Sequence, residues 1–362
     1  MTAKLAWMPA ETTEKGADTE SCREAAHTLL SIAKSWRCTD SGVNPTADLL
    51  AWVEERNAET EVVIRKIPLE ECAPWFYDSA EGCIRNQNRS FFTITGLRGE
   101  DFAQPVIVQN EIGYLGILCK EIGGVMHFLL QAKIEPGNVN CVQISPTIQA
   151  TKSNFSRKHG GKQPLYLEYF LNAAKYEIVA DQIQSEQSSR FYKKRNRNII
   201  IRVEEDVPVL PGFRWMTLGQ IKTLMRYDNL VNMDTRTVLS CIPFSRLRLG
   251  PDEQEELSAL FPDKPLFRSV FEDTPDDPLP VVYQYINNRK MFAEDCLQFV
   301  PLDSLENWEP RGGELVCKEP YPFKVVFCDI DIQGREVRRW TQPLFEATGV
   351  ATFGLVCCEV NG

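Results

Sequence analysis

Histidine is scarce in this sequence, with three residues among 362, and cysteine is not arranged for metal binding. None of the twelve cysteines forms a Cys-x-x-Cys pair, and the neighbouring Cys357 and Cys358 have neither a second pair nor a nearby histidine. Structural zinc sites need four such ligands at short spacings. We therefore expect no metal site, and we interpret the cysteines as small, reduced core residues of a cytoplasmic protein.

Long apolar runs and an excess of positive charge are also missing. No segment approaches the roughly 18 uncharged apolar residues of a membrane span, and the first residues are polar where a signal peptide is apolar. The net charge of −10 argues against nucleic acid as a partner. With 43% hydrophobic and 25% charged residues, the composition is that of a soluble globular protein, and the length predicts two or three domains.

Two neighbouring stretches carry polar side chains at every second position. Residues 125–134 alternate, so that Gln131 and Lys133 share one face, and residues 139–151 alternate in the same way, with Gln143 among the polar side chains. A polar row on an otherwise apolar strand lines a pocket more readily than it fills a core. We interpret the pair as an active-site hairpin.

The loop length decides whether the two polar rows meet. A three-residue loop at 136–138 pairs Gln131 with Gln143 and His127 with Thr147, whereas a two-residue loop places the rows on opposite sides of the sheet. Gly137 tolerates the positive φ that favours the longer loop. Pro146 cannot donate to a central ladder and belongs at an edge, a bulge or a strand end.

The chain also repeats itself. Residues 49–75 match 282–308, which aligns Trp75 with Trp308, and after a short length difference residues 96–124 match 334–362 without a gap. We predict a polar lead with a helix at 1–44, a first copy at 45–202 with a complete site, a helical connector at 203–277, and a second copy at 278–362 that is incomplete at its C-terminal end. The connector contains a helical stretch capped by Thr217, a turn through residues 231–240, and a proline-rich hinge at 275–280.

Two further segments have the residues to bind an anion. In HGGK at 159–162, paired glycines let backbone amides point into one concavity, although a plain turn is as common. Basic residues crowd into 190–197, where a solvated strand is the alternative interpretation. A diphosphate needs several such donors within hydrogen-bond reach.

The strings QAKIEPGN (131–138), QISPTIQAT (143–151), QSEQSSRFYKKRN (184–196), VNMDTRTVLSC (231–241) and GREVRRWTQPL (334–344) together resemble the NDP-4-keto-6-deoxyhexose 2,3-dehydratases of antibiotic deoxysugar pathways. This resemblance covers nearly all the chain from about Leu49. It implies an α+β fold of tandem Nudix-like domains, with mixed β-sheets flanked by helices, and a homodimer. It also implies dTDP-4-keto-6-deoxyglucose as substrate, no cofactor, and a downstream 3-ketoreductase that consumes the unstable product. Members normally carry the second copy through to a hairpin of its own, which this chain lacks.

The implied reaction assigns roles to the polar residues. Elimination of water across C2 and C3 of a 4-keto sugar needs a base, donors to the enolate oxygen, and an acid for the departing hydroxyl. We expect Lys133 and Gln131 to be the donors, and Glu135 or His159 to be the acid and base. Substrate binding falls to Gln143, Thr147, Gln149, Asn154, Gly160, Gly161, Tyr166, Arg190, Tyr192, Lys193 and Lys194.

Within that binding set, the first three residues would orient the hexose, and the glycines with Arg190, Lys193 and Lys194 would hold the diphosphate. Tyr166 or Tyr192 would stack on thymine. Two other functions stay open: a catalytically silent sugar-nucleotide binding or scaffold protein, and a Nudix-type diphosphate hydrolase. The hydrolase would need clustered carboxylates for magnesium, where this polar face has amides and lysine.

Overall fold

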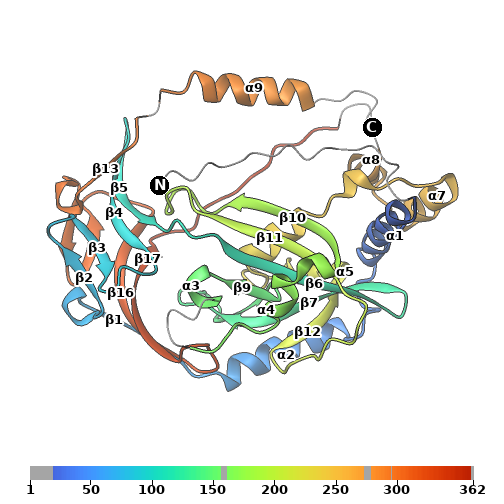
Figure 1. Cartoon of the computed structure of the whole chain (residues 1–362), viewed down its shortest axis with the longest axis horizontal. Coiled ribbons are helices and arrows are strands. Elements are labelled where there is room, and N and C mark those ends of the chain that lie inside the picture. The colour runs from blue at the N-terminus through green and yellow to red at the C-terminus, as the bar shows by residue number, and fades with distance from the viewer. Residues whose placement is uncertain (1–18, 156–160, 273–278, 295, 360–362) are drawn as a thin grey trace, which may run out of the picture.

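The computed structural model describes residues 19–155, 161–272, 279–294 and 296–359. Three β-sheets form the body, one of seven strands and two of five, with helices packed mainly around the largest (Figure 1). The predicted α+β class is confirmed. None of the helices in the described part of the chain is long and apolar enough to cross a membrane.

The seven-stranded sheet is formed by the middle of the chain. Its strands are β6 (Gly113–Ile122), β7 (Val125–Ile134), β8 (Val142–Ser145), β9 (Ile148–Ala150), β10 (Glu177–Ser185), β11 (Arg195–Arg202) and β12 (Phe213–Thr217). Neighbouring strands are antiparallel except for the parallel pair β6 and β11. Because β12 comes from the predicted connector and pairs with β7, that connector contributes to this sheet.

The alternation predicted for residues 125–134 is confirmed by β7. Phe128 and Leu130 belong to one apolar cluster, whereas Leu129 belongs to the cluster of the other face. Around the sheet pack helices α1 (Thr19–Ser35), α2 (Thr46–Glu59), α3 (Lys152–Phe155), α4 (Leu167–Leu171), α5 (Leu218–Leu224), α6 (Met233–Ser240), α7 (Pro251–Leu260) and α8 (Lys264–Phe271). Short 3₁₀ turns lie at Leu69–Glu71, Ala173–Lys175, Phe244–Arg246 and Leu302–Ser304. Thr217 caps α5 as predicted, accepting a hydrogen bond from the backbone of Gln220.

The predicted hairpin register is wrong by two residues. Ile134 pairs with Val142, so residues 135–141 form the loop, and Lys133 faces Gln143. Since the shift is even, the polar rows still share one face, as expected. The predicted pairing of His127 with Thr147 is also wrong, because β8 ends just before Pro146 and β9 turns away to pair with β6.

The two five-stranded sheets exchange one strand each. Strands β2 (Trp75–Asp78), β3 (Cys83–Asn86), β4 (Thr93–Arg98) and β5 (Ala103–Val108) are joined by β13 (Gln298–Val300). Strands β14 (Trp308–Arg311), β15 (Glu314–Cys317), β16 (Phe323–Ile332) and β17 (Arg339–Ala347) are joined by β1 (Val62–Ile67). Each sheet thus takes its extra strand from the distant part of the chain that the sequence alignment makes equivalent.

Side chains repeat this exchange. The indole of Trp75 donates to the carbonyl of Thr341 at 2.9 Å, and the indole of Trp308 donates to the carbonyl of Ala103 at 3.0 Å. The two tryptophans are aligned residues, and so are their two acceptors. These paired contacts support the duplicated organisation that the alignment suggests.

One part of the sequence alignment is wrong. Gly96 lies within β4, where it pairs with Pro105, whereas Gly334 lies in the turn between β16 and β17 with φ +83°. The residue that pairs with Pro343 is Phe327, so Phe327 is the structural equivalent of Gly96. The extra residues therefore lengthen the hairpin between β16 and β17.

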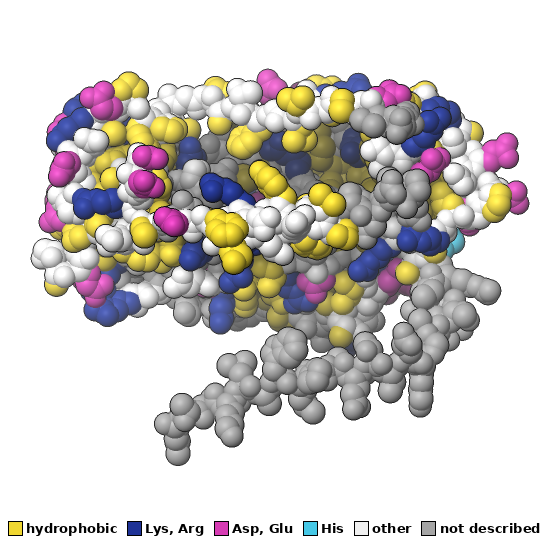
Figure 2. All heavy atoms as spheres, turned by 90° about the horizontal axis from the view of Figure 1, so that it is seen from above, with side chains coloured by type: hydrophobic (Ala, Val, Ile, Leu, Met, Phe, Trp, Pro, Cys, Tyr) yellow, Lys and Arg dark blue, Asp and Glu magenta, His cyan; other side chains and the backbone are white. Residues whose placement is uncertain are grey.

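Helix α9 (Leu279–Met291) stands apart from the sheets (Figure 1). It buries no residue, whereas the aligned helix α2 buries Leu49, Trp52 and Val53. Seen from the side of α9, the surface shows hydrophobic side chains among charged ones (Figure 2).

Candidate active site

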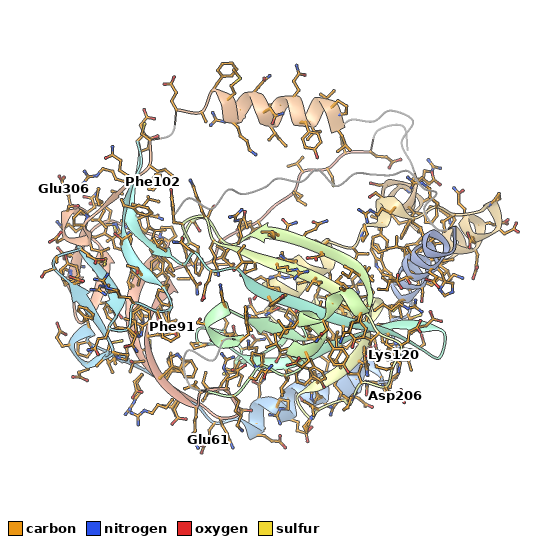
Figure 3. The ribbon with its side chains drawn as sticks, viewed as in Figure 1. Glu61, Phe91, Phe102, Lys120, Asp206 and Glu306 are labelled. Carbon is orange, nitrogen blue, oxygen red and sulfur yellow. The ribbon has the colours of Figure 1, made fainter. Side chains whose placement is uncertain are left out.

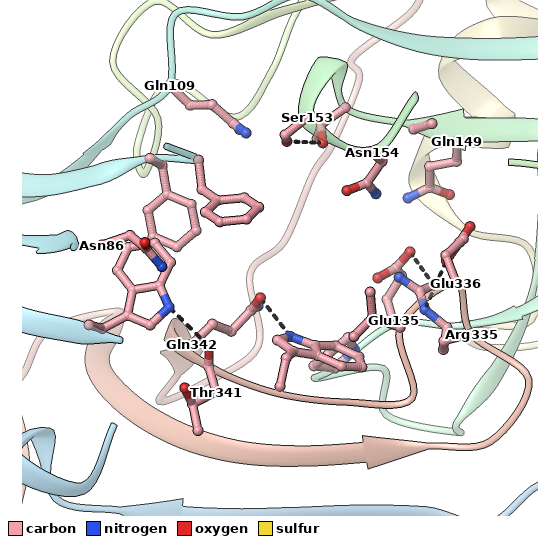
Figure 4. A pocket seen from close by; sticks show the side chains of 18 of the residues that line it. Asn86, Gln109, Glu135, Gln149, Ser153, Asn154, Arg335, Glu336, Thr341 and Gln342 are labelled. Carbon is pink, nitrogen blue, oxygen red and sulfur yellow. Dashed lines mark hydrogen bonds and ion pairs between the residues drawn. The ribbon is translucent and has the colours of Figure 1, made fainter. Parts of the chain in front are cut away.

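A cavity of about 1280 Å³ lies where the three sheets approach one another (Figure 4). Its walls come from β1, β3, the ends of β6 and β7, β9, and the hairpin between β16 and β17. Cavities that bind drug-sized molecules enclose roughly 300–1,000 Å³, so this one has room for a larger ligand. Both aligned halves of the chain contribute side chains to it.

One end of the cavity is charged. The Lys133 ammonium donates to the carbonyl of Gln149 at 2.8 Å and pairs with the Glu135 carboxylate at 2.8 Å. Arg335 reaches in from the hairpin between β16 and β17, with one guanidinium nitrogen 3.0 Å from the same carboxylate and 3.1 Å from the carbonyl of Ile134 (Figure 4). Lysine has three N–H groups, so these two contacts leave one for a ligand.

Electrostatics fix the charge of Glu135. Burial alone would raise its pKa, but Arg335 and Lys133 outweigh burial and lower the pKa to about 2. A carboxylate with that pKa is ionised at neutral pH and has no proton to donate. Its contacts suit it to hold Lys133 and Arg335 in place.

A second carboxylate lines the same cavity with the opposite behaviour. Burial raises the pKa of Asp234 to about 7, and the negative charges of Glu186 and Glu135 add to that rise, while Lys133 opposes it. A group with this pKa exchanges protons readily at neutral pH.

The other end of the cavity is aromatic. Trp75 packs on Phe92, with ring centroids 4.6 Å apart, and Phe91 lines the same space. The Trp340 ring lies toward the charged end, with its centroid 5.9 Å from the guanidinium carbon of Arg335. Amide side chains of Asn86, Gln109 and Gln342 lie beside them, across the cavity from Glu135 and Arg335 (Figure 4). Flat apolar walls with a few amides are suited to a nucleobase.

Five of the predicted site residues line the cavity: Lys133, Glu135, Gln149, Asn154 and Lys194. Lys194 donates to the carbonyl of Glu111, and burial lowers its pKa. His159 and Gly160 lie outside the described residues, so their roles stay predictions.

The other predicted residues that the structure describes do not line the cavity: Gln131, Gln143, Thr147, Gly161, Tyr166, Arg190, Tyr192 and Lys193. Gln131 donates to the carbonyls of Pro146 and Thr147, at 2.8 and 3.3 Å. The Thr147 hydroxyl donates to the carbonyl of Leu129 and accepts from the backbone of Leu118. These amides and hydroxyls are used to join β7 to the segment around Pro146.

The tyrosines and basic residues predicted to hold the nucleotide have other contacts. The Tyr166 hydroxyl donates to the carbonyl of Pro208 at 2.7 Å, and Tyr192 packs on Phe299, with centroids 4.7 Å apart. The Arg190 guanidinium lies 5.5 Å from the centroid of the Phe323 ring. Lys193 lies over the Tyr192 ring. The geometry therefore does not bring this predicted cluster together around the cavity.

Sequence reasoning missed the site residues that come from distant segments. The exchange of strands between the two halves brings four such residues to the cavity, namely Arg65, Arg335, Arg339 and Trp340. Asp234 was missed because residues 231–240 were predicted to be a turn, whereas 233–240 form helix α6. Both 231–241 and 334–344 are among the strings that carry the family resemblance, which was the one available signal.

Comparison with known proteins finds relatives in one family. Residues 46–242 and 280–362 match the family model of NDP-hexose 2,3-dehydratases. Three curated relatives are each described as a dTDP-4-dehydro-6-deoxy-α-D-glucopyranose 2,3-dehydratase. That of Saccharopolyspora spinosa is 38% identical over 89% of this chain and 67% of its own length. Those of Amycolatopsis orientalis and Streptomyces violaceoruber are 34% and 35% identical, over 91% and 88% of this chain and 68% and 71% of their own lengths.

Proposed function

The chain belongs to the NDP-hexose 2,3-dehydratase family, and on that premise we propose that it eliminates water across C2 and C3 of dTDP-4-keto-6-deoxyglucose. The product is the 3,4-diketo-2,6-dideoxy sugar nucleotide of deoxysugar biosynthesis. The observation that carries the assignment to this cavity is its division into a charged end at Lys133 and an aromatic end at Trp75. A sugar nucleotide has the same division between its hexose and its base.

The chemistry explains what the charged end must supply. The C3 hydrogen of a 4-keto sugar is acidic because the resulting carbanion delocalises onto the C4 oxygen. The remaining N–H of Lys133 donates to that oxygen as negative charge develops on it. Glu135, Arg335 and the carbonyl of Gln149 act as positioning groups, since they fix the ammonium without contacting the sugar.

The remaining cavity residues serve the nucleotide. We assign the diphosphate to Arg65, Lys194 and Arg339, which line the cavity and do not pair with Glu135. Arg65 and Arg339 share the carboxylate of Asp329, and the further lining cation Lys66 is held by Glu314 and Glu346. Guanidinium groups suit phosphate oxygens because they present parallel N–H donors. The thymine lies between the aromatic side chains at the other end, where stacking needs only a flat apolar face.

Several finer assignments rest on the resemblance and the composition. We propose two Nudix-like repeats per chain, a homodimer, a cytoplasmic location, and an antibiotic deoxysugar pathway. A 3,4-diketo sugar is reactive, so the next enzyme is a ketoreductase that acts at C3. Light scattering of the purified chain measures the predicted dimer directly.

A trapping assay tests the function. The purified chain is incubated with dTDP-4-keto-6-deoxyglucose, NADPH and a 3-ketoreductase, with and without EDTA, and products are identified by mass spectrometry. We expect a 2-deoxy sugar nucleotide under both conditions. Release of dTMP would support a diphosphate hydrolase, and binding without any product would support a silent sugar-nucleotide protein.

Two lysine variants connect this activity to the cavity. Lys133→Met removes the proposed oxyanion donor and should lower kcat by about 10²-fold or more. Lys120→Met is the matched control, because Lys120 lies on β6 of the seven-stranded sheet and pairs with Asp206. Both residues lie far from Phe91, which lines the cavity (Figure 3). Equal activity of the two variants would remove Lys133 from the mechanism.

A further inference from the structure

Asp234 is held at the charged end of the cavity by its neighbours in the chain. Asn232, the N-cap of α6, donates to the Ser145 hydroxyl at 3.0 Å and to the side-chain oxygen of Gln149 at 3.1 Å. Thr235 donates to the carbonyl of Ile144 at 3.1 Å. The first turn of α6 is therefore fixed on β8 and β9 from both sides of Asp234.

The same network connects the first turn of α6 to Lys133. Gln149 accepts from Asn232 through its side chain and from the Lys133 ammonium through its backbone carbonyl. Both Asp234 and Lys133 line the cavity, and their charges interact. A ligand bound to Lys133 in this cavity would therefore lie near the Asp234 carboxylate.

Asp234 has no structural partner that explains its position. Within the described ranges, no hydrogen bond or ion pair engages its carboxylate, whereas Glu135 pairs with Lys133 and Arg335. Glu186, which also faces Asp234, is engaged by the Asn196 amide at 2.7 Å.

A role in helix stability does not account for Asp234 either. An aspartate in the first turn stabilises a helix through its charge. Here burial and the carboxylates of Glu186 and Glu135 favour the neutral form, and Lys133 alone opposes them. The surroundings therefore work against the charged form that a stabilising role requires.

We propose that Asp234 is a catalytic residue of the dehydration, acting first as the base at C3 and then as the acid at C2. This inference rests on the proposed function. The Asp234 carboxylate takes the C3 proton, and the C3–H electrons move into the enolate, whose oxygen faces Lys133. The enolate then collapses to form the C2–C3 double bond as the C2–O bond breaks. Asp234 returns its proton to the departing hydroxyl, so water leaves and the carboxylate is restored. The C3 enol formed in this way then tautomerises to the 3,4-diketone, with loss of its O–H proton and gain of a proton at C2.

The electrostatics suit both steps. A carboxyl group with a pKa near 7 is partly ionised at neutral pH, so it can accept a proton and give it back within one turnover. Glu135 is less suited to these steps, because Arg335 and Lys133 hold the pKa of its carboxyl group well below the ordinary value. The two carboxylates thus divide the work between proton transfer and positioning.

The test compares Asp234→Asn with the control Asp228→Asn, whose side chain is exposed on the preceding turn. Exchange of solvent deuterium into C3 is followed by NMR, and turnover is measured with the trapping reductase. Asp234→Asn should lose about 10³-fold in both measurements, while its affinity for dTDP stays within about twofold of wild type. Asp228→Asn should match wild type throughout.

A pH profile separates proton transfer from a structural role. Since the base must be ionised, wild-type kcat/KM should fall as pH drops below about 7. Asp234→Glu should keep partial activity, and its kcat/KM should fall at a different pH. This variant also serves if Asp234→Asn does not fold. The assignment of Asp234 alone would be overturned by either of two results. One is deuterium exchange at C3 by Asp234→Asn at the wild-type rate, and the other is a pH profile of kcat/KM for Asp234→Glu that falls at the same pH as that of wild type. Failure of the wild-type chain to form a 2-deoxy product would overturn the proposed function, and the assignment with it.

Discussion

At the scale of residues, the charged end of the cavity depends on one carboxylate between two cations. Glu135 contacts Lys133 and Arg335, and its side chain is 31% exposed while that of Lys133 is 8% exposed. Removing one member of such a group leaves a charge without its partner in a poorly solvated place. The geometry of Lys133 therefore depends on a residue more than two hundred positions away in the sequence.

Arg335→Met should destabilise the protein by about 3 kcal/mol at neutral pH, because Glu135 then lacks its arginine. Glu135→Gln leaves Arg335 with only the Glu336 carboxylate at 3.6 Å and should also be destabilising, whereas the double variant should recover part of the loss. Urea unfolding of the four proteins measures this coupling. Single losses that simply add in the double variant would show that the two side chains do not interact.

The same pair predicts a pH dependence. The folded pKa of Glu135 is lowered from 4.5 to about 2, so its contribution to stability is complete above pH 4.5 and is lost as pH falls toward 2. The stability difference between wild type and Arg335→Met should therefore shrink as pH falls from about 6 to about 3. A difference that stays constant would contradict the lowered pKa.

Residue patterns predicted one part of the site and missed another. Alternation along residues 125–134 identified Lys133, because a strand that borders a cavity has a polar side chain on its cavity face. Alternation also favoured Gln131 in this stretch and Gln143 in residues 139–151, and both lie on the same face but outside the cavity lining. Periodicity gives the face of a strand, and the strand's position along the cavity comes only from tertiary packing.

At the scale of elements, the exchanged strands are what brings the two halves together. β1 pairs with β16, and β13 pairs with β4, so each half supplies an outer strand to the other. The hairpin between β16 and β17 then carries Arg335 to the end of β7. Sequence alignment found the equivalent elements but could not show the exchange, because both pairings obey the same local alternation.

Matching variants test the symmetry of this exchange. Trp75→Phe and Trp308→Phe each remove one indole donor to a carbonyl of the other half. Each variant should lower the free energy of unfolding by about 1–3 kcal/mol, because it leaves a carbonyl without its donor. The two losses should be similar. Trp36→Phe is the control for loss of the larger ring, because Trp36 packs among phenylalanines such as Phe244. The free energy of unfolding is measured with urea. A full loss of stability in one of the variants Trp75→Phe and Trp308→Phe, with no loss in the other, would contradict the symmetric exchange.

At the scale of the whole molecule, the cavity exists only where all three sheets meet. The charged end, where we propose that the hexose binds, is built mainly from the seven-stranded sheet and α6, and the aromatic end comes from the two five-stranded sheets. Length and composition predicted a soluble protein of two or three domains, the family resemblance implied the α+β fold, and the duplication was visible in the sequence. The place where the sheets meet could not be predicted from the sequence, because it depends on contacts between residues far apart in the chain.

A crystal structure of the chain with bound dTDP-D-glucose tests this account most directly. We predict that the hexose lies beside Lys133 and Asp234, the diphosphate beside Arg65 and Arg339, and the thymine among Trp75 and its aromatic neighbours. A nucleotide bound outside this cavity, or a hexose at the aromatic end, would contradict the account.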